Sequence, residues 1–239
     1  MAVMKSNSIE DWVPKTELGR KVKNGEIKDL SQILDSGSKI LEPEIVDKLL
    51  PDLIVELVEV GQSKGKFGGG KESIWKQTQK KTSEGNTIKF SAFAAVGNKD
   101  GYIGVGFGGA KETVPAREKA IRTAKLNIVK IRRGCGSWAC DCRTPHSIPY
   151  KISGKSGSVK VELSPAPRGT GLKSERKCGV LLGLAGVKDV YTRTEGITAT
   201  KLNLLKACYY ALKNLTTFKM KEGSEKEVGL VEGSSRASK

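Results

Sequence analysis

The chain has 239 residues, which is enough for one large domain or two ordinary domains with a real core. Its 42 lysines and arginines outnumber its 26 acidic residues, and the formal net charge of +16 indicates a polyanionic partner rather than a free enzyme. No apolar run approaches the roughly 20 residues of a membrane-spanning helix, and the N-terminus lacks a signal-peptide core. We therefore expect a soluble, cytoplasmic protein.

The first part of the chain carries weak structural signals. Residues 1–41 mix helical patches with glycines and many charges, and we expect an N-terminal extension without a core of its own. The string EPEIVDKLLP, residues 42–51, has apolar residues at helical spacing after a proline and predicts a short amphipathic helix. Residues 63–71, SKGKFGGGK, have too little hydrophobicity to order themselves, so we expect a flexible loop whose cations face solvent or phosphate.

A β-hairpin is the clearest local signal. Apolar residues alternate along its first strand, at Ile88, Phe90, Ala92, Ala94 and Val96. The alternation stops at a turn containing Asp100-Gly101 and resumes as YIGVGF, residues 102–107, which predicts two paired strands. A weaker strand, Ile74 to Thr78, precedes the hairpin across a polar loop, Gln79 to Asn86.

A basic amphipathic helix is predicted to begin near Pro115. The apolar positions on one side are Ala116, Ala120, Ile121, Ala124 and Ile128, and the cations mostly on the other side are Arg117, Lys119, Arg122 and Lys125. Residues 42–131 therefore follow the order helix, three strands, helix, which is that of a double-stranded-RNA-binding domain. Helix cations often only face solvent, but the surplus of positive charge favours RNA here.

Three glycines point to a different class of protein. Gly104, Gly106 and Gly109 form a literal G-x-G-x-x-G, as in a dinucleotide-binding turn. However, the helix begins several residues after the last glycine, and no carboxylate stands about 20 residues further on to bind a ribose. The basic pair Arg132 and Arg133 could favour a 2′-phosphate, which keeps a nucleotide-dependent oxidoreductase as a weaker alternative. We expect the glycines to let RNA or a neighbouring strand come close.

Four longer stretches resemble the universal small-subunit ribosomal protein five family. KFSAFAAVGNKDGYIGVGFGGAKETVP, Lys89 to Pro115, is similar to its signature, and VELSPAPRGTGL, Val161 to Leu172, and AGVKDVYTRTEG, Ala185 to Gly196, resemble its C-terminal domain. RRGCGSWACDCRTPHSIPYK, Arg132 to Lys151, resembles the linker of the archaeal branch. One departure is the loop at 63–71, which looks longer than the family's usual spacing.

The resemblance implies a structural constituent of the small ribosomal subunit and not an enzyme. It implies partners in small-subunit ribosomal RNA (rRNA), in messenger RNA where it enters the subunit, and in neighbouring ribosomal proteins. It also implies roles in assembly, decoding accuracy and messenger unwinding. The loop Gln79 to Asn86 matches a family hairpin that reaches RNA. The predicted RNA-binding residues are Lys76, Gln79, Lys80, Lys81, Lys89, Lys111, Arg117, Lys119, Arg122, Lys125, Arg132, Arg133 and Arg168.

Residues 159–218 predict a second domain in which strands and helices alternate. The expected elements are a strand at Val159 to Leu163, a helix at Ser174 to Leu184, a strand at Asp189 to Thr192 and a final helix from about Thr200. The core stripe of the final helix is Leu205, Cys208, Leu212 and Leu215. Cys178 and Cys208 are expected in the core, and residues 219–239 are expected to be disordered when free. The predicted fold class is α+β, with a double-stranded-RNA-binding-like domain followed by a small α/β domain.

The linker, residues 132–158, contains a cluster of candidate metal ligands. Cys135, Cys140, Cys142 and His146 follow a C-x4-C-x-C-x3-H pattern that includes the only histidine of the chain. Four such ligands on a glycine-rich loop suit a structural zinc ion, although zinc sites usually use C-x2-C knuckles. The other interpretation is a linker with free thiols that packs on RNA. A zinc-containing free RNA-binding factor would explain the charge and the cysteines, but not the second domain. Catalysis by a Cys–His pair would need an oxyanion site and a pocket that nothing nearby indicates.

Overall fold

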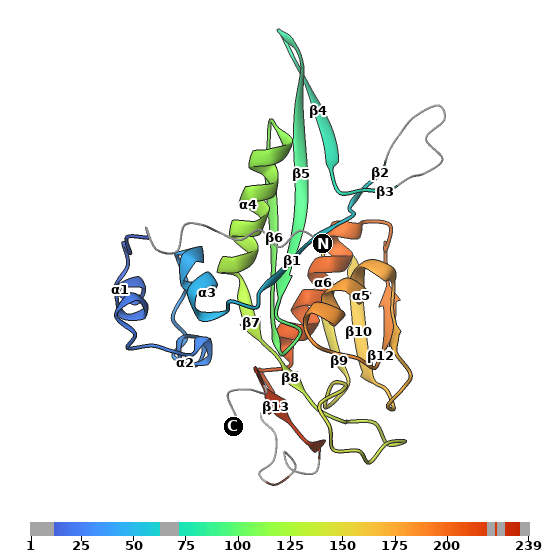
Figure 1. Cartoon of the computed structure of the whole chain (residues 1–239). Coiled ribbons are helices and arrows are strands. Elements are labelled where there is room, and N and C mark those ends of the chain that lie inside the picture. The colour runs from blue at the N-terminus through green and yellow to red at the C-terminus, as the bar shows by residue number, and fades with distance from the viewer. Residues whose placement is uncertain (1–11, 63–71, 219–222, 224–227, 235–239) are drawn as a thin grey trace. The chain divides into compact units, whose positions relative to one another are not determined.

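The computed structural model describes residues 12–62, 72–218, 223 and 228–234 (Figure 1). The chain folds as two compact units. The first combines Met1–Val96 with Gly104–Ile128, and the second combines Gly97–Ile103 with Val129–Lys239. Each unit contains a sheet and helices, which confirms the α+β class. The loop predicted at 63–71 lies outside the described residues. Within the described part of the chain, no helix is long and apolar enough to cross a membrane.

The first unit begins with three short helices. They are α1 (Glu17–Asn24), α2 (Leu30–Asp35) and α3 (Pro43–Leu49). The hydroxyl of Thr16 caps α1 by accepting a hydrogen bond from the Gly19 amide, and α1 ends at Gly25, whose φ is 82°. α3 starts at the predicted proline and confirms the helix expected at 42–51.

The expectation that residues 1–41 lack a core is wrong. From residue 12 on, where the structure describes this segment, the buried apolar residues are Trp12, Val22, Leu30, Ile33 and Ile40. The carboxylate of Glu42 accepts hydrogen bonds from the Trp12 indole at 2.9 Å and from the Thr16 amide at 2.7 Å. These bonds lower the pKa of Glu42 even though burial opposes the shift. The segment before α3 is therefore attached to the start of that helix.

The main sheet of the first unit has the strand order β1-β5-β6-β7, and β4 pairs with β5 beside that path. Its strands are β1 (Ile54–Val58), β4 (Lys76–Thr82), β5 (Gly85–Gly97), β6 (Tyr102–Ala110) and β7 (Ile128–Lys130). A separate two-stranded sheet joins β2 (Gly61–Gln62) to β3 (Glu72–Ser73). The predicted β5–β6 hairpin is confirmed, with Gly101 at a φ of 97° in its turn. Strands β1 and β7 were not predicted from the sequence.

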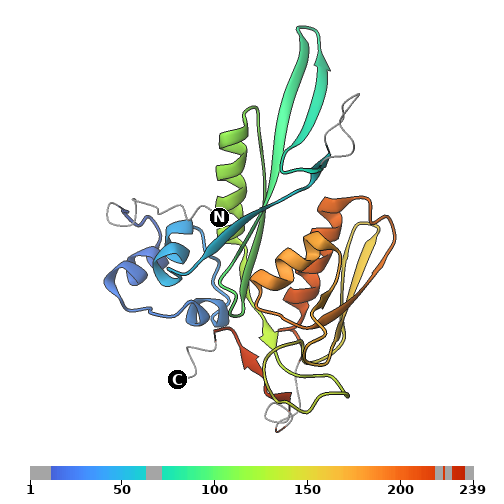
Figure 2. The ribbon, with the colours of Figure 1, turned by 45° about the vertical axis from the view of Figure 1, so that its right-hand side comes forward.

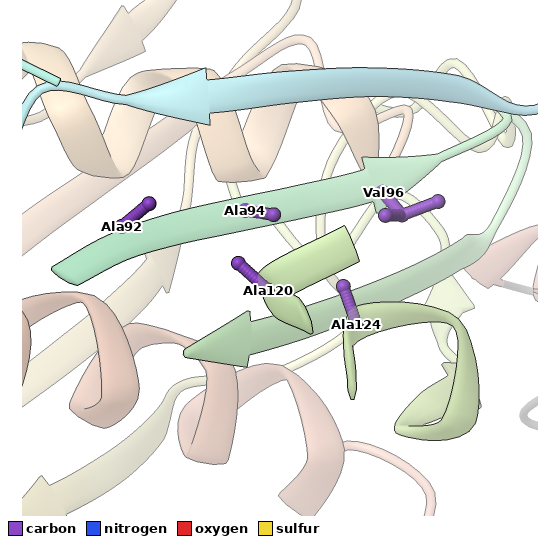
Figure 3. Packing of buried hydrophobic residues seen from close by; sticks show 5 residues of the cluster. All are labelled: Ala92, Ala94, Val96, Ala120 and Ala124. Atoms are coloured by element: carbon purple, nitrogen blue, oxygen red, sulfur yellow. The ribbon is translucent and has the colours of Figure 1, made fainter. Parts of the chain in front are cut away.

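Helix α4 (Thr113–Leu126) packs on β5 and β6 through small residues (Figure 3). Ala92, Ala94 and Val96 of β5 share one buried cluster with Ala120 and Ala124 of α4. The apolar helix face predicted from the sequence is thus the packing face. Because all but one of these side chains are alanines, the helix lies close to the sheet.

Three glycines of β6 make this close approach possible. A Cβ added at Gly104, Gly106 or Gly108 would lie 2.2–2.4 Å from backbone atoms of α4. Gly104 and Gly106 belong to the G-x-G-x-x-G string. Both allow the helix to come close, so the expectation that they let RNA or a neighbouring strand come close is wrong. The backbone of α4 occupies the place that a pyrophosphate would need, which removes the nucleotide alternative.

The second unit contains a four-stranded sheet in the order β11-β12-β10-β9, with helices α5 and α6 (Figure 2). The elements are β9 (Ile152–Ser156), β10 (Val159–Pro165), β11 (Leu172–Lys173), α5 (Arg176–Leu184), β12 (Val190–Glu195) and α6 (Lys201–Asn214). Strand β10 is antiparallel to β9 and β12, and β11 is parallel to β12. A glycine again admits a helix, because a Cβ on Gly154 would lie 2.2 Å from the Ala207 oxygen of α6.

The core of the second unit agrees with the sequence analysis. The predicted stripe of α6 is fully buried, at Leu205, Cys208, Leu212 and Leu215. Cys178 is 1% exposed and also belongs to the core, so both cysteines lie where they were expected. The pKa of Cys208 is raised well above its ordinary value by its hydrogen bond with Cys178 and by burial. Sequence reasoning missed β9, which pairs in register with β10.

Part of the C-terminal tail is ordered, which corrects the expectation of disorder for Val228 to Ser234. Strand β13 (Val231–Glu232) pairs antiparallel with β8 (Arg132–Arg133) in the linker. The Cys135 amide donates to the Val228 carbonyl at 2.8 Å. The hydroxyl of Ser234 donates to Asp100 Oδ2 at 2.7 Å. This part of the tail therefore holds the linker that contains the Cys/His cluster.

Candidate nucleic-acid interface and metal centre

The predicted loop Gln79 to Asn86 is instead the end of a two-stranded ribbon. β4 and β5 pair antiparallel from Lys76 opposite Ser91 to Thr82 opposite Gly85, so only Ser83 and Glu84 form the turn. Every residue from 76 to 89 is exposed. The sequence did not predict these strands because apolar and polar residues alternate only where one face of a strand is buried, and both faces are exposed here.

The pairing register places ribbon lysines on a common face. In an antiparallel pair, directly opposite residues point to the same side, and residues two apart along a strand do as well. Thr78 lies opposite Lys89, so Lys76, Lys80 and Lys89 share one face of the ribbon, and Lys81 lies on the other. The only acidic residue between 76 and 89 is Glu84 at the turn. Like charges on one exposed face repel one another, and a polyanion relieves that repulsion.

Some cations of α4 are exposed, and one forms an ion pair inside the protein. Lys119 and Arg122 are exposed, as is Lys111 just before the helix, whereas Arg117 is partly buried. Lys125 instead forms an ion pair with Asp47 of α3, with 2.7 Å between Nζ and Oδ2. Lys125 therefore joins two helices of the first unit.

Arg132 and Arg133 also form ion pairs within the protein. Arg133 is 5% exposed, and its Nη2 lies 2.7 Å from Asp100 Oδ1 and 3.1 Å from the Gly233 carbonyl oxygen. Arg132 pairs through Nε with Glu232 Oε1 at 2.5 Å. Both arginines therefore stabilise the junction between the linker and the tail. This geometry favours a structural role for both and not the predicted contact with phosphate.

Arg168 is exposed on a tight turn between β10 and β11. The turn contains Gly169 at a φ of 89° and Gly171 at a φ of 72°, conformations that favour glycine. Both glycine amides donate to Asp189 Oδ1, at 3.1 and 2.8 Å. The turn is thus held by a buried carboxylate, while the guanidinium group of Arg168 remains accessible.

The four candidate metal ligands come together in the second unit. One ligand atom from each of Cys135, Cys140, Cys142 and His146 lies within 4.8 Å of the others. A tetrahedron with zinc–sulfur bonds of about 2.3 Å has edges of roughly 3.8 Å, so a small contraction would complete the site. Cys135 and His146 are buried, and the other two are partly buried. The donor set of three thiols and one imidazole fits zinc.

His146 is oriented by a second residue that the sequence analysis did not assign to the site. Its Nδ1 lies 2.7 Å from Asp189 Oδ2, and both side chains are 6% exposed. A carboxylate only accepts, so Nδ1 carries a proton, and in the neutral imidazole the lone pair is then on Nε2. Nε2 lies 3.9 Å from the sulfur of Cys140, on the side of the cluster. A carboxylate–histidine pair of this kind is typical of metal sites.

The thiols of the cluster differ in acidity. Burial raises the pKa of Cys135 to about 11, with further contributions from hydrogen bonds to Cys142 and Cys140. The hydrogen bond with Thr144 lowers the pKa of Cys142 to about 6. One thiol is therefore ready to bind a cation as thiolate, and another ionises only when a cation replaces its proton.

Comparisons with known proteins agree with the fold. Residues 74–132 match the N-terminal domain of ribosomal protein S5, and residues 154–225 match its C-terminal domain. The small ribosomal subunit protein uS5 of Nanoarchaeum equitans is 48% identical over 227 residues, which are 95% of this chain and 97% of that protein. The chain belongs to the ribosomal protein S5 family.

Two other uS5 proteins are similar over comparable lengths. That of Methanocaldococcus jannaschii is 47% identical over 226 residues, which are 95% of this chain and 97% of that protein. That of Staphylothermus marinus is 46% identical over 218 residues, which are 91% of this chain and 95% of that protein. The family resemblance inferred from the sequence is thus confirmed. The Cys/His cluster lies between the two S5 domain matches.

Proposed function

We propose that this chain is a structural constituent of the small ribosomal subunit, where it binds rRNA and performs no catalysis. The observation that carries the proposal is the near-complete alignment with archaeal uS5 proteins at 46–48% identity. The net charge of +16 and the exposed basic ribbon supply the electrostatic means of binding a polyanion.

The proposed phosphate contacts are those cations predicted from the sequence that the structure leaves exposed or partly exposed. They are Lys76, Lys80, Lys81 and Lys89 of the ribbon, with Gln79 beside them, Lys111, Arg117, Lys119 and Arg122 at α4, and Arg168 in the second unit. Lysines suit this role because they supply charge without demanding one geometry. The ion-paired Lys125, Arg132 and Arg133 are left out of the set.

The position within the subunit is a finer proposal. We infer that the protein lies near the point where messenger RNA enters, contacts neighbouring ribosomal proteins and supports assembly and decoding accuracy. Family membership supports this placement. The ribbon formed by β4 and β5 extends beyond the part of the sheet that α4 covers (Figure 1), as an element that reaches into RNA would.

Salt-dependent binding to purified small-subunit rRNA tests the RNA surface. Each phosphate contact changes the slope of log K against log salt by roughly 0.7–0.9. The double variant Lys80→Ala/Lys81→Ala should therefore flatten the slope by roughly 1.5 and weaken binding at low salt. The matched control is Lys28→Ala/Lys39→Ala, which removes two exposed charges outside the proposed surface. Equal losses in both variants would show a diffuse charge effect and contradict the ribbon assignment.

We also propose that the Cys/His cluster binds one structural zinc ion, for which the convergence of four ligand atoms within 4.8 Å is the support. The ion would staple a linker of irregular structure and take no part in catalysis. Metal analysis of the full chain purified without chelator should find about one zinc per chain. Free thiols with no bound metal, both after purification and after addition of Zn²⁺, would instead support the interpretation of a thiol-containing linker packed on RNA.

A further inference from the structure

Asp189 joins the proposed metal centre to the turn that presents Arg168. One of its carboxylate oxygens, Oδ2, accepts a hydrogen bond from His146 Nδ1 at 2.7 Å. The other, Oδ1, accepts from the amides of Gly169 and Gly171 at 3.1 and 2.8 Å. Because Asp189 is 4% exposed, these donors replace the water that the carboxylate loses on folding. A single buried group therefore serves both the metal ligand and the turn.

Backbone and hydroxyl contacts tie the same segments together. The Ser147 hydroxyl donates to the Asp189 carbonyl at 2.5 Å and accepts from the Ala166 amide at 3.3 Å. The His146 carbonyl accepts from the amides of Lys188 and Asp189 at 2.8 and 3.1 Å. A displacement of His146 therefore reaches the two residues that precede β12 directly, and it reaches Ala166, the first residue of the turn, through Ser147.

The turn has little other support. A Cβ built on Gly169 or Gly171 would meet nothing within 4 Å. Thr170 bonds back to the Pro167 carbonyl, through its amide at 3.3 Å and its hydroxyl at 2.8 Å. These bonds shape the turn locally but do not attach it to the core. At its start the turn is attached through the buried Ala166, whose amide donates to Ser147. Beyond Ala166, the attachment comes from the two glycine amides on Asp189 and from the Gly171 carbonyl, which accepts from the Val190 amide at 3.2 Å.

We propose that Asp189 is a positioning residue through which Zn²⁺ at the Cys/His cluster orders the 166–171 turn and so presents Arg168 to an RNA phosphate. The inference rests on the proposed zinc site. A bound zinc fixes Nε2 of His146, which leaves the Nδ1–H pointing at Asp189. Without the ion the imidazole can rotate or change tautomer, and the carboxylate loses its fixed partner.

Hydrogen exchange and zinc competition on the full chain test the coupling. Exchange is followed in the peptide that covers residues 166–172, for zinc-loaded and chelated protein, and zinc affinity is measured against a competing chelator. The test variant is Asp189→Asn, whose amide oxygen can still accept from the glycines but whose nitrogen cannot accept from His146. The control is Asp141→Asn, which removes a carboxylate from the ligand loop itself, where it is 89% exposed.

The coupling predicts that chelation speeds exchange in the wild-type turn by about tenfold or more. It also predicts that Asp189→Asn weakens zinc binding by about 10–100-fold and makes turn exchange insensitive to zinc, while Asp141→Asn behaves as wild type. A purely structural Asp189 would leave zinc affinity unchanged in the variant.

Each failure has its own signature. A wild-type chain that binds zinc but whose turn exchanges equally with and without the ion overturns the coupling and leaves the zinc site intact. A wild-type chain that binds no zinc overturns the site and the coupling together. The wild-type comparison needs no variant, so it decides the coupling even where Asp189→Asn fails to fold.

Discussion

Two regions that look irregular in the sequence fold in opposite ways. The β4–β5 ribbon, residues 76–89, has a regular backbone ladder and an exposed surface throughout. The part of the linker that contains the Cys/His cluster, residues 134–147, has one isolated backbone bridge, between Gly134 and Ser147, and buries His146 and Cys135. The ribbon thus relies on backbone hydrogen bonds, whereas the linker relies on side chains and, in our proposal, on a metal ion.

This difference separates two roles. An exposed ribbon can be altered without disturbing a core, so its sequence is free to serve RNA. An irregular linker with buried polar groups is stable only when each group has a partner. Changes to the linker should therefore alter the stability of the second unit, and changes to the ribbon should alter RNA binding.

The largest expected effect follows loss of the metal. Cys140→Ser should reduce zinc from about one ion per chain to none and lower the thermal midpoint of the second unit by at least about 8 °C. Hydrogen exchange should increase across the linker and stay unchanged in the ribbon, which is the internal control. An unchanged midpoint, measured by calorimetry on the zinc-loaded parent and the variant, would show that the linker needs no ion.

The next effect concerns the buried half of β5 and its neighbour β6. Gly106→Ala places a Cβ 2.2 Å from both the Ala120 carbonyl oxygen and the Ala124 amide nitrogen. These are backbone atoms of α4, so relieving the clash requires the helix to shift. We expect a loss of about 2–3 kcal/mol in the free energy of unfolding, from denaturant titration. The control is Gly183→Ala in α5, where a Cβ meets nothing within 4 Å, and it should be neutral or stabilising by up to about 1 kcal/mol. Similar losses in both variants would contradict the close-packed seam.

A change in the ribbon should spare the core. Gly85 has a φ of 117° at the turn and open space around it, so Gly85→Ala strains the turn without a clash. Amide exchange in residues 76–89 should increase and rRNA affinity should fall several-fold. The free energy of global unfolding should change by less than about 0.5 kcal/mol. A larger global loss would mean that the ribbon supports the core.

The tail contributes less to the linker than the metal does. Glu232 pairs with Arg132 and Lys130, and its side chain is 34% exposed, so solvent weakens the contribution. Glu232→Gln should increase amide exchange in residues 228–234 by a factor that corresponds to about 0.5–1 kcal/mol. Zinc content should not change. Loss of zinc in this variant would show that the tail and the metal hold the linker as one unit.

The smallest effect belongs to an ion-pair cluster outside both regions. Hydrogen bonds from Lys160 and Lys151 lower the pKa of Glu162 to about 2, below its ordinary value of 4.5. The ionised carboxylate therefore stabilises the fold above pH 4.5, and this stabilisation is lost as the pH falls toward 2. Denaturant titrations of wild type and Glu162→Gln should differ by a constant amount at neutral pH and converge at low pH. A difference independent of pH would contradict the assignment.

Much of the fold could be predicted because its signals are local. The β5–β6 hairpin and helices α4, α5 and α6 show clear apolar periodicity, and the structure has all of them. Strand β1 was missed because its sequence, IVELV, does not alternate apolar and polar residues, and most of its residues are only partly buried. The N-terminal core was missed because helices of six to eight residues are too short to show a clear apolar periodicity.

The candidate site shows the same limit. The cluster of Cys135, Cys140, Cys142 and His146 is local in sequence and could be found. Asp189 lies 43 residues from His146, and no sequence pattern connects them. The basic pair Arg132-Arg133 looked like an RNA contact because a charge run does not reveal ion pairs with distant residues. Arg132 pairs with Glu232, 100 positions away, and Arg133 pairs with Asp100, 33 positions away.

Sedimentation of cell extract through a gradient at low salt, with each fraction probed for this chain, tests the central claim most directly. The account predicts a peak on the small ribosomal subunit and on translating ribosomes, released only at high salt because many phosphate contacts give a steep salt dependence. A chain found mainly at the top of the gradient, as free protein, would contradict it.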